Sequence, residues 1–423
     1  MTDFNLPHDA AFRHHGWKTL YSKLNNPKVY TWGENSNGRL GHNNPPVPGG
    51  MGMSVPGRMG MRHREVASPR ELIALRGKGI VDIMSGGWSF HALDRHGRVW
   101  MWGTLQEEIP VSVSLGTKVV REPAQVELPS HVRVQSVSCG RSHAIALGKD
   151  GSIWHWCNRW KPQQVHIPMD STSHIVQITA NWGYSSVLTN TGEIFLVPHP
   201  PNIASFEEEV SDLAISTTGV SLSFIESDMR IANKDLQLQP GDKFVQIAGM
   251  QDYTLALTQT GRVFKLCTRE NEDFSASPAK YTVELKHYGA KQPERNDRSK
   301  GMQRFVSAAF TNFAVYTADG KVMLGKSDDP ADHIPKVLEG LDHDICKVSF
   351  GDHHTGALTN HGSLLTWGAY SSGALGHDEN MERVEKPKVV AGLQNMFVFG
   401  IGFGGWQSAV LAIPLEQAFT PDE

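Results

Sequence analysis

The amino-acid sequence predicts an all-β protein, a seven-bladed β-propeller whose ring is closed by half-repeats from its two ends. Three observations lead to this prediction. Copies of one strand–turn–strand template recur along the chain, the third strands of these copies number seven, and the last copy is completed by the first residues of the array. Because a repeat architecture extends one core over many units, 423 residues need not form several domains.

The template is clearest in residues 79–103, 134–157 and 345–368, and weaker copies occupy 175–197, 244–267 and 305–325. An apolar first strand ends at a glycine, a second strand ends near a leucine, and a second glycine precedes an alternating third strand. Glycine at the second turn permits a positive φ, so short antiparallel strands are expected. The two glycines are 11 residues apart in each clear copy, at Gly86 and Gly97, Gly140 and Gly151, and Gly351 and Gly362.

The apolar positions and the third-strand tryptophans are predicted to be core. These tryptophans are Trp102, Trp156 and Trp367.

The two ends of the array complement each other. The last copy, 398–413, contains only the first half of the template, whereas VYTWGENSNGRLGH at 29–42 matches LLTWGAYSSGALGH at 364–377. A repeat divided between the termini closes a ring and pairs edges that would otherwise be open.

Seven third strands are predicted, and therefore seven blades. They lie at 29–32, 99–102, 153–156, 194–197, 263–266, 322–324 and 364–367. One stretch, 209–233, leaves an alternative open, since it resembles an eighth, degenerate copy.

The amino-acid composition limits the classes of partner that we expect. Lys and Arg number 40 and Asp and Glu number 44, a formal net charge of -4, which favours neither nucleic acid nor an anionic membrane. The four cysteines show no C-x-x-C spacing, which fits neither a disulfide framework nor a zinc site. No secretory leader and no apolar run of membrane-spanning length is present in the sequence. We therefore expect a protein of the cytoplasm, the nucleus or both, with no cofactor.

Three strings carry a family resemblance. TWGENSNGRLGH (31–42), SCGRSHAIALGKDG (138–151) and SFGDHHTGALTNHG (349–362) resemble the repeat of the regulator of chromosome condensation family. The resemblance implies a seven-bladed propeller over residues 29–413. It constrains function less, because this fold serves exchange factors for small GTPases, ubiquitin-ligase components, a plant photoreceptor and adaptors.

The residues before the propeller suggest a pathway. Phe12, Trp17, Leu20, Tyr21 and Leu24 have the spacing of a short amphipathic helix, which either caps the ring or has another role. The Trp-Lys-x-Leu-Tyr pattern also resembles the segment that follows the F-box in fungal SCF-associated factor proteins, in which an F-box precedes such a propeller. Only 28 residues precede Val29, too few for a complete F-box, so the chain is interpreted as a truncated member of that group or as a stand-alone propeller.

The predicted organisation has three parts. They are a lead at 1–28, the propeller at 29–413 and a tail at 414–423.

No catalytic motif is found, and no catalytic or metal-binding residue is predicted. His14-His15 and Asp352-His353-His354 are the candidate metal ligands, but His354 shares a template column with His143 and Tyr253, which favours a structural role near the turn. The glycine-rich stretch 49–64 is interpreted as a flexible loop rather than a phosphate site. A non-enzymatic binding module is therefore expected, with nucleotide exchange left open.

Binding is predicted on the turns that follow the first strands, because the same turn of every blade lies at the same height. The alternative is that some of these aromatic side chains fold over the blade cores. The predicted partner-binding residues are Trp88, Arg141, Trp182, Asp252, His353 and Trp406. The acidic insertion 198–212 and the basic insertion 286–304 are interpreted as solvated loops or as salt-sensitive docking elements.

The leading functional hypothesis is substrate recognition for an SCF-type E3 ubiquitin ligase, with an upstream F-box binding the cullin adaptor. The alternative is a guanine-nucleotide exchange factor for a small GTPase.

Overall fold

The structure is a computed structural model, and its described residues form a ring of strands. They are 27–42, 65–105, 119–157, 162–198, 224–226, 230–231, 236, 238–268, 282–289, 303–317, 320–338, 345–369, 372–377 and 383–418. The predicted helix within 12–24, His14-His15, the loop 49–64 and most of the two charged insertions lie outside the described residues.

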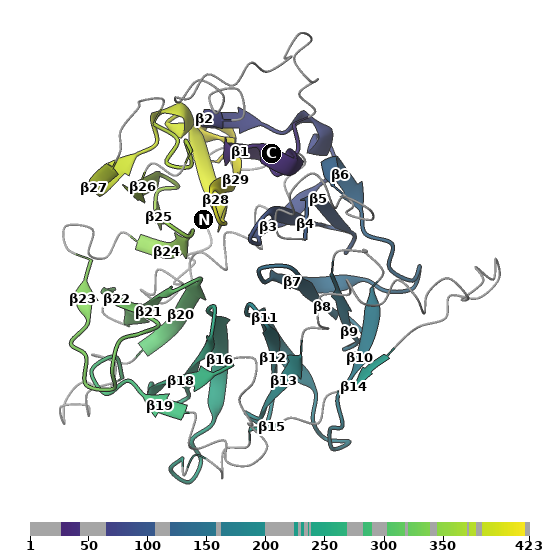
Figure 1. The fold of residues 1–423 in the computed structure, drawn as a ribbon, viewed down its shortest axis with the longest axis vertical. Helices are drawn as coiled ribbons and strands as arrows, with labels where there is room; N and C mark the ends of the chain where they lie inside the picture. Colours follow the sequence, from purple (N-terminus) through teal and green to yellow (C-terminus); the bar gives the residue numbers. More distant parts are fainter. Residues whose placement is uncertain are drawn as a thin grey trace, which may run out of the picture.

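The described strands form seven sheets arranged around a central axis (Figure 1). We number the sheets as blades 1 to 7, starting from the sheet that contains β3 and ending with the one that contains β28. The inner strands contact one another in this order around the ring, and β28 of blade 7 contacts β3 of blade 1. The predicted seven-bladed propeller is confirmed.

Each blade is an antiparallel sheet of four strands, with a fifth in blade 2. The inner strands are β3 (Ile80–Ser85), β7 (Val134–Cys139), β11 (Ile175–Ala180), β16 (Phe244–Gly249), β20 (Gln303–Ala309), β24 (Ile345–Phe350) and β28 (Met396–Phe403). The second strands are β4 (Ser89–Asp94), β8 (Ala144–Gly148), β12 (Tyr184–Thr189), β17 (Tyr253–Thr258), β21 (Asn312–Thr317), β25 (His354–Thr359) and β29 (Gln407–Pro414).

The third strands agree with the seven predicted segments. They are β5 (Val99–Gly103), β9 (Ile153–Trp156), β13 (Ile194–Pro198), β18 (Val263–Cys267), β22 (Val322–Lys326), β26 (Leu364–Ala369) and β1 (Lys28–Glu34). The outer strands are β6 (Val120–Gln125), β10 (Gln163–His166), β15 (Arg230–Ile231), β19 (Thr282–Glu284), β23 (Lys336–Val337), β27 (Arg383–Val389) and β2 (Glu65–Glu71). Short helical turns are η1 (Ser36–Gly38), η3 (Ile73–Leu75), η7 (Ala391–Leu393) and α2 (Leu415–Ala418).

Blade 7 joins the two ends of the chain, as the half-repeats predict. Its strand order is β2-β1-β29-β28, so the N-terminal half supplies the two outer strands and the C-terminal half the two inner ones. In Figure 1 the purple β1 and β2 lie beside the yellow β28 and β29. The β1–β29 pairing runs without interruption from Lys28 opposite Ala412 to Gly33 opposite Gln407. Backbone hydrogen bonds therefore close the ring.

The stretch 209–233 does not form an eighth blade in the part that the structure describes. Its strand β14 (Phe224–Glu226) pairs in parallel with β10 at the outer edge of blade 2, and its strand β15 pairs with β13 as the outer strand of blade 3. The two short strands of this stretch therefore cover the outer edges of blades 2 and 3.

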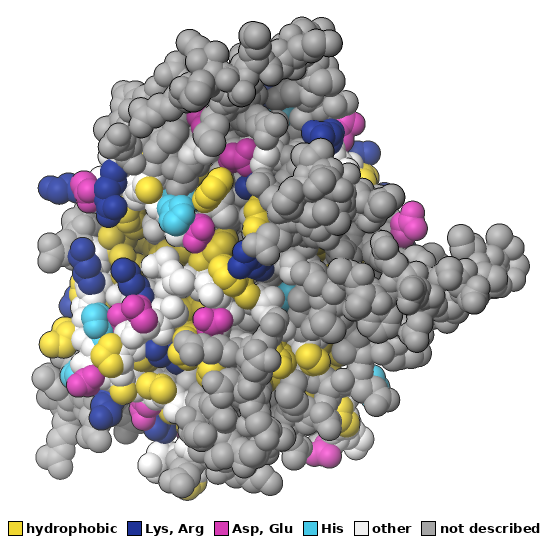
Figure 2. All heavy atoms as spheres, in the orientation of Figure 1, with side chains coloured by type: hydrophobic (Ala, Val, Ile, Leu, Met, Phe, Trp, Pro, Cys, Tyr) yellow, Lys and Arg dark blue, Asp and Glu magenta, His cyan; other side chains and the backbone are white. Residues whose placement is uncertain are grey.

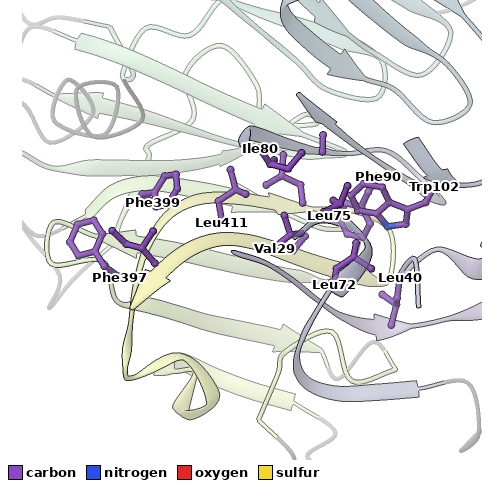
Figure 3. Packing of buried hydrophobic residues seen from close by; sticks show 14 residues of the cluster. Val29, Leu40, Leu72, Leu75, Ile80, Phe90, Trp102, Phe397, Phe399 and Leu411 are labelled. Carbon is purple, nitrogen blue, oxygen red and sulfur yellow. The ribbon is translucent and has the colours of Figure 1, made fainter. Parts of the chain in front are cut away.

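A hydrophobic cluster lies between the closing blade and blade 1 (Figure 3). Val29, Phe399 and Leu411 of blade 7 share it with Phe90 and Trp102 of blade 1, and all five are at most 2% exposed. The Phe90 and Trp102 ring centroids are 5.6 Å apart. Burial of apolar area from both chain ends in one core favours the closed ring over an open array.

The predicted third-strand tryptophans pack as expected in two of three blades. Trp102 and Trp156 are buried, whereas Trp367 is half-buried against the cluster between blades 5 and 6.

Glutamine side chains hydrogen-bond to backbone groups of the inner strand in the next blade. The Gln177 amide Nε2 donates to the Ile247 carbonyl at 2.8 Å, and its Oε1 accepts from the Ile247 N–H at 2.9 Å. Gln246 repeats the arrangement with Val306 one blade further on, at 3.2 and 2.9 Å. Because an unpaired buried backbone group is costly, these amides stabilise the junctions between blades 3, 4 and 5.

The two template glycines are required for different reasons. The second glycine has a positive φ in each clear copy, 77° at Gly97, 84° at Gly151 and 75° at Gly362, as the turn predicts. The first glycine is needed because the next blade approaches it closely. A Cβ on Gly140 would lie 2.1 Å from the Asn181 carbonyl oxygen of blade 3 and 2.6 Å from Cε1 of His143.

We therefore expect Gly140→Ala to lower the free energy of unfolding by about 1–3 kcal/mol, the usual effect of overpacking a core. Urea unfolding followed by tryptophan fluorescence measures this change. Gly289→Ala is the matched control, because the nearest atom to its Cβ would be 3.7 Å away. Equal midpoints for the two variants would contradict the close-approach explanation.

Candidate functional site

Seven short loops join the inner strands to the second strands and surround one end of the central axis. We call them the ring loops, and they comprise 86–88, 140–143, 181–183, 250–252, 310–311, 351–353 and 404–406. Backbone hydrogen bonds link neighbouring ring loops, since the Trp182 N–H donates to the Gln251 carbonyl at 3.2 Å and the Gln251 N–H to the Phe310 carbonyl at 2.6 Å. Bonds of this kind hold neighbouring ring loops together in a collar, which serves as a platform for side chains.

Three of the six predicted residues form one cluster, which we call the Arg141 stack. The guanidinium carbon of Arg141 is 5.1 Å from the ring centroid of Trp88 and 4.3 Å from that of Trp182. These residues come from blades 1, 2 and 3, and all three are half-buried. Both distances are within the range of cation–π attraction, which is worth about 0.5–1 kcal/mol at exposed sites.

Phe310 of blade 5 extends the stack. Its ring meets Trp182 edge-on, with centroids 6.5 Å apart and an interplanar angle of 89°. This edge-to-face geometry is one that aromatic pairs prefer. Phe310 lies on the ring loop between β20 and β21 and was not among the predicted binding residues.

The other three predicted residues lie on the ring loops of blades 4, 6 and 7. Asp252 is half-buried and accepts a hydrogen bond from the Gln251 side-chain amide at 3.4 Å. His353 and Asp352 are exposed, with His353 Nε2 3.5 Å from Asp352 Oδ2. Trp406 is 43% exposed. None of the ring tryptophans folds into a blade core, so the alternative of core packing is wrong for Trp88, Trp182 and Trp406.

Inside the collar is a central cavity of about 240 Å³ lined by all seven inner strands. Among the described residues, the charged side chains that line it are Arg141 and Lys347, and no Asp or Glu is among its lining residues. Polar hydroxyls contribute as well, including Ser138 and Ser307. The face shown in Figure 2 has hydrophobic side chains toward the middle of the ring, with basic, acidic and histidine side chains around them.

Lys347 was missed by the sequence analysis, although a signal for it existed. It occupies the same place in its inner strand as Gln177 and Gln246 do in theirs, two residues after the strand's first apolar position. Only the structure shows that Lys347 lines the central cavity, whereas Gln177 and Gln246 hydrogen-bond to the inner strand of the next blade.

The template histidines are structural. His354 Nε2 lies 2.8 Å from Ser408 Oγ, and His143 Nε2 lies 2.9 Å from Ser185 Oγ, so each histidine bonds a serine of the next blade. His354 therefore has a structural role, as predicted, and its partner is a side chain of the next blade. Burial lowers the pKa of His354 to about 3. No three His, Cys, Asp or Glu side chains of the described ranges lie together so as to hold a metal ion.

The four cysteines are free thiols. Cys139 Sγ is 3.1 Å from Nδ1 of His91, whose Nε2 accepts a hydrogen bond from Trp156 Nε1 at 3.2 Å. Burial raises the pKa of the Cys139 thiol, and it raises the pKa of Cys346 to about 12. Since the thiolate is the nucleophile, these environments fit packing rather than covalent chemistry.

The comparisons with known proteins agree with this fold. A sequence profile of the Regulator of chromosome condensation (RCC1) repeat matches residues 28–93, which run from the closing strand β1 into blade 1. The crystal structure of Prp20p from Saccharomyces cerevisiae, reported with its binding properties to Gsp1p and histones, superposes with a TM-score of 0.63 at 16% identity. It covers 94% of this chain and 95% of that one. The chain is an RCC1-type propeller in fold.

Two curated relatives differ in function. The human E3 ubiquitin-protein ligase HERC2 is 24% identical over 425 residues, covering 92% of this chain but 8% of HERC2. The human RCC1-like G exchanging factor-like protein is 25% identical over 299 residues, covering 62% of this chain and 59% of that protein. The chain thus spans less than two thirds of either relative. No helix in the described part of the chain has the length and apolar character to cross a membrane.

Proposed function

We propose that this chain is a protein-binding propeller that uses its ring loops to select a protein substrate for ubiquitination. The observation that carries the proposal is the Arg141 stack, a half-buried arginine held against two indole rings on a rigid collar. Tryptophan and arginine are the residue types that most often dominate binding energy in protein interfaces. The similarity to HERC2 over 92% of the chain supports the ubiquitin pathway.

Recruitment to an SCF-type ligase is the finer part of the proposal. It rests on the Trp-Lys-x-Leu-Tyr pattern of residues 17–21, which resembles the segment after the F-box in fungal SCF-associated factor proteins. In this arrangement the propeller binds the substrate, and an upstream F-box binds the cullin adaptor. We also propose that the protein acts in the cytoplasm, the nucleus or both.

The double variant Trp88→Ala and Trp406→Ala tests the binding surface. We expect it to lose its protein partner in affinity purification, while its thermal unfolding stays near that of the wild type, because both side chains lie on the ring loops outside the cores. A substrate role further predicts that the lost partner has a longer cellular half-life in the variant strain. Pulse-chase measurement of that partner checks this outcome.

The control for this experiment is Trp100→Ala, since Trp100 is half-buried on blade 1 but lies on a third strand, away from the ring loops. It should retain the partner. If Trp88→Ala with Trp406→Ala unfolds the protein, or if partner binding persists, the ring loops are not the recognition surface.

Guanine-nucleotide exchange on a small GTPase is the second candidate. The similarity to the RCC1-like G exchanging factor-like protein supports it, as does the fold shared with Prp20p, whose reported structure concerns binding to Gsp1p. An exchange factor needs no catalytic side-chain motif, because it acts by binding the nucleotide-free GTPase. Purification of the tagged chain separates the two candidates, with cullin and its adaptor expected from the first and a nucleotide-free GTPase from the second.

A further inference from the structure

Building on the proposed protein-binding function, we infer that the partner docks through a short acidic segment whose carboxylates enter the central cavity, one pairing with Arg141 at the mouth and another with Lys347 further in. Such docking requires a cationic lining, an arginine held in position for a carboxylate, and a cavity that admits side chains but no folded element.

The charge of the cavity lining favours an anion. Arg141 lies on a ring loop at the mouth, and Lys347 lies on β24, four residues before the template glycine Gly351. At about 3.3 Å per residue, that places the Lys347 backbone about 13 Å further along the strand. The described lining contains no carboxylate, although the whole chain carries a net charge of -4. The positive character is therefore confined to the cavity lining, since Asp252 and Asp352 lie on the surrounding ring loops, and low-dielectric walls strengthen the attraction of the lining for anions.

The stack prepares Arg141 for a carboxylate. The guanidinium is planar, and its N–H donors form a fixed fork that matches the two oxygens of a carboxylate. Contacts at 5.1 and 4.3 Å restrict the side chain before any partner binds. Less rotamer freedom is then lost on binding, which raises affinity.

The size of the cavity identifies the occupant as an extended segment. A volume of about 240 Å³ admits one or two side chains, whereas a helix or hairpin is far larger. Two cations within a closed collar also cannot follow the phosphates of a nucleic acid, which needs a continuous basic track. An acidic peptide meets both limits, since its side chains project singly from an extended backbone.

The test uses the whole chain and a fluorescein-labelled Gly-Ser peptide that carries a run of glutamates, with the glutamine version of the same peptide as its counterpart. Fluorescence anisotropy should show binding of the glutamate peptide, weakening as salt rises. Arg141→Gln should reduce the affinity at least about tenfold, and Lys347→Gln should also reduce it. Arg141→Lys should recover only part of the loss, because lysine keeps the charge without the planar fork.

The matched control is Arg383→Gln, which removes a 65% exposed arginine from the outer strand β27 of blade 6 and should leave binding unchanged. Thermal unfolding of each variant confirms that it is folded. Equal binding of the glutamate and glutamine peptides, or an Arg141→Gln variant that binds normally, overturns the inference. So does competition by inorganic phosphate at equal concentration, which would show a small-anion site.

The outcome also separates the two proposals. If Trp88→Ala with Trp406→Ala loses the cellular partner while the glutamate peptide never binds the wild type, the protein-binding function stands and the acidic-segment inference fails.

Discussion

Trp32→Ala should lower the free energy of unfolding by about 3–5 kcal/mol, the usual effect of removing a buried aromatic side chain. Trp32 lies on β1, the strand that joins the N-terminal half of blade 7 to its C-terminal half, and it is 0% exposed. Its Nε1 donates to the Ala374 carbonyl at 2.8 Å, and its ring meets Phe403 edge-on at 6.3 Å. The variant therefore loses packing and a buried hydrogen bond at the closure of the ring.

Urea unfolding at one protein concentration measures this effect. Trp406→Ala is the control on the same blade, because its side chain is 43% exposed and should change the midpoint little. A Trp32→Ala midpoint equal to that of Trp406→Ala would mean that blade 7 does not limit the stability of the ring.

The strand order and closure could be predicted from the sequence because each depends on local pattern. The sequence contains regularly spaced glycine turns, apolar strands of period 2 and two complementary half-repeats. Few topologies bury the apolar faces of such strands. The outer strands were not predictable in this way. Strand β15 has two residues and β14 three, and both come from a stretch that resembled another blade. Their pairing depends on which sheet edge lies nearby, which the sequence does not encode locally.

The candidate site could also be predicted where it depends on the repeat, but not where it depends on the placement of individual side chains. Equal height on the ring follows from the repeat, so the ring loops were found, with Trp88, Arg141 and Trp182 among them. That the Arg141 side chain reaches both indoles depends on blade spacing and side-chain direction, which repeat counting does not provide. Lys347 was missed for a related reason. In the sequence, an inner-strand residue that lines the cavity cannot be distinguished from any other polar strand residue.

Acid should destabilise the ring well above the pH at which carboxylates protonate, because three buried imidazoles are neutral in the fold. Burial lowers the pKa of His91 and His354 to about 3 and that of His42 to about 4. An unfolded histidine has a pKa of about 6.5, so below that pH the unfolded chain binds protons that the native state does not. Stability is then fully present above about pH 6.5 and falls as the pH drops toward the folded-state values.

Each such histidine should lower the free energy of unfolding by about 1.4 kcal/mol at pH 5.5, and the three together by about 4 kcal/mol. Equilibrium urea unfolding between pH 7.5 and 5.5 measures the loss, a window in which ordinary carboxylates stay ionised. His354→Gln keeps a side chain able to bond Ser408 but removes one titration, so its loss of stability between pH 7.5 and 5.5 should be smaller by about 1.4 kcal/mol.

The neighbouring His353→Gln is the control, since it removes an imidazole that is 55% exposed and leaves the buried set intact. An unchanged stability from pH 7.5 to 5.5 would contradict the neutral buried state. If His353→Gln flattens the profile as much as His354→Gln does, the acid sensitivity belongs to the ring-loop surface. A shallower profile in His354→Gln alone assigns it to the hydrogen bonds between blades, so that the junctions, rather than the recognition surface, determine how the propeller responds to pH.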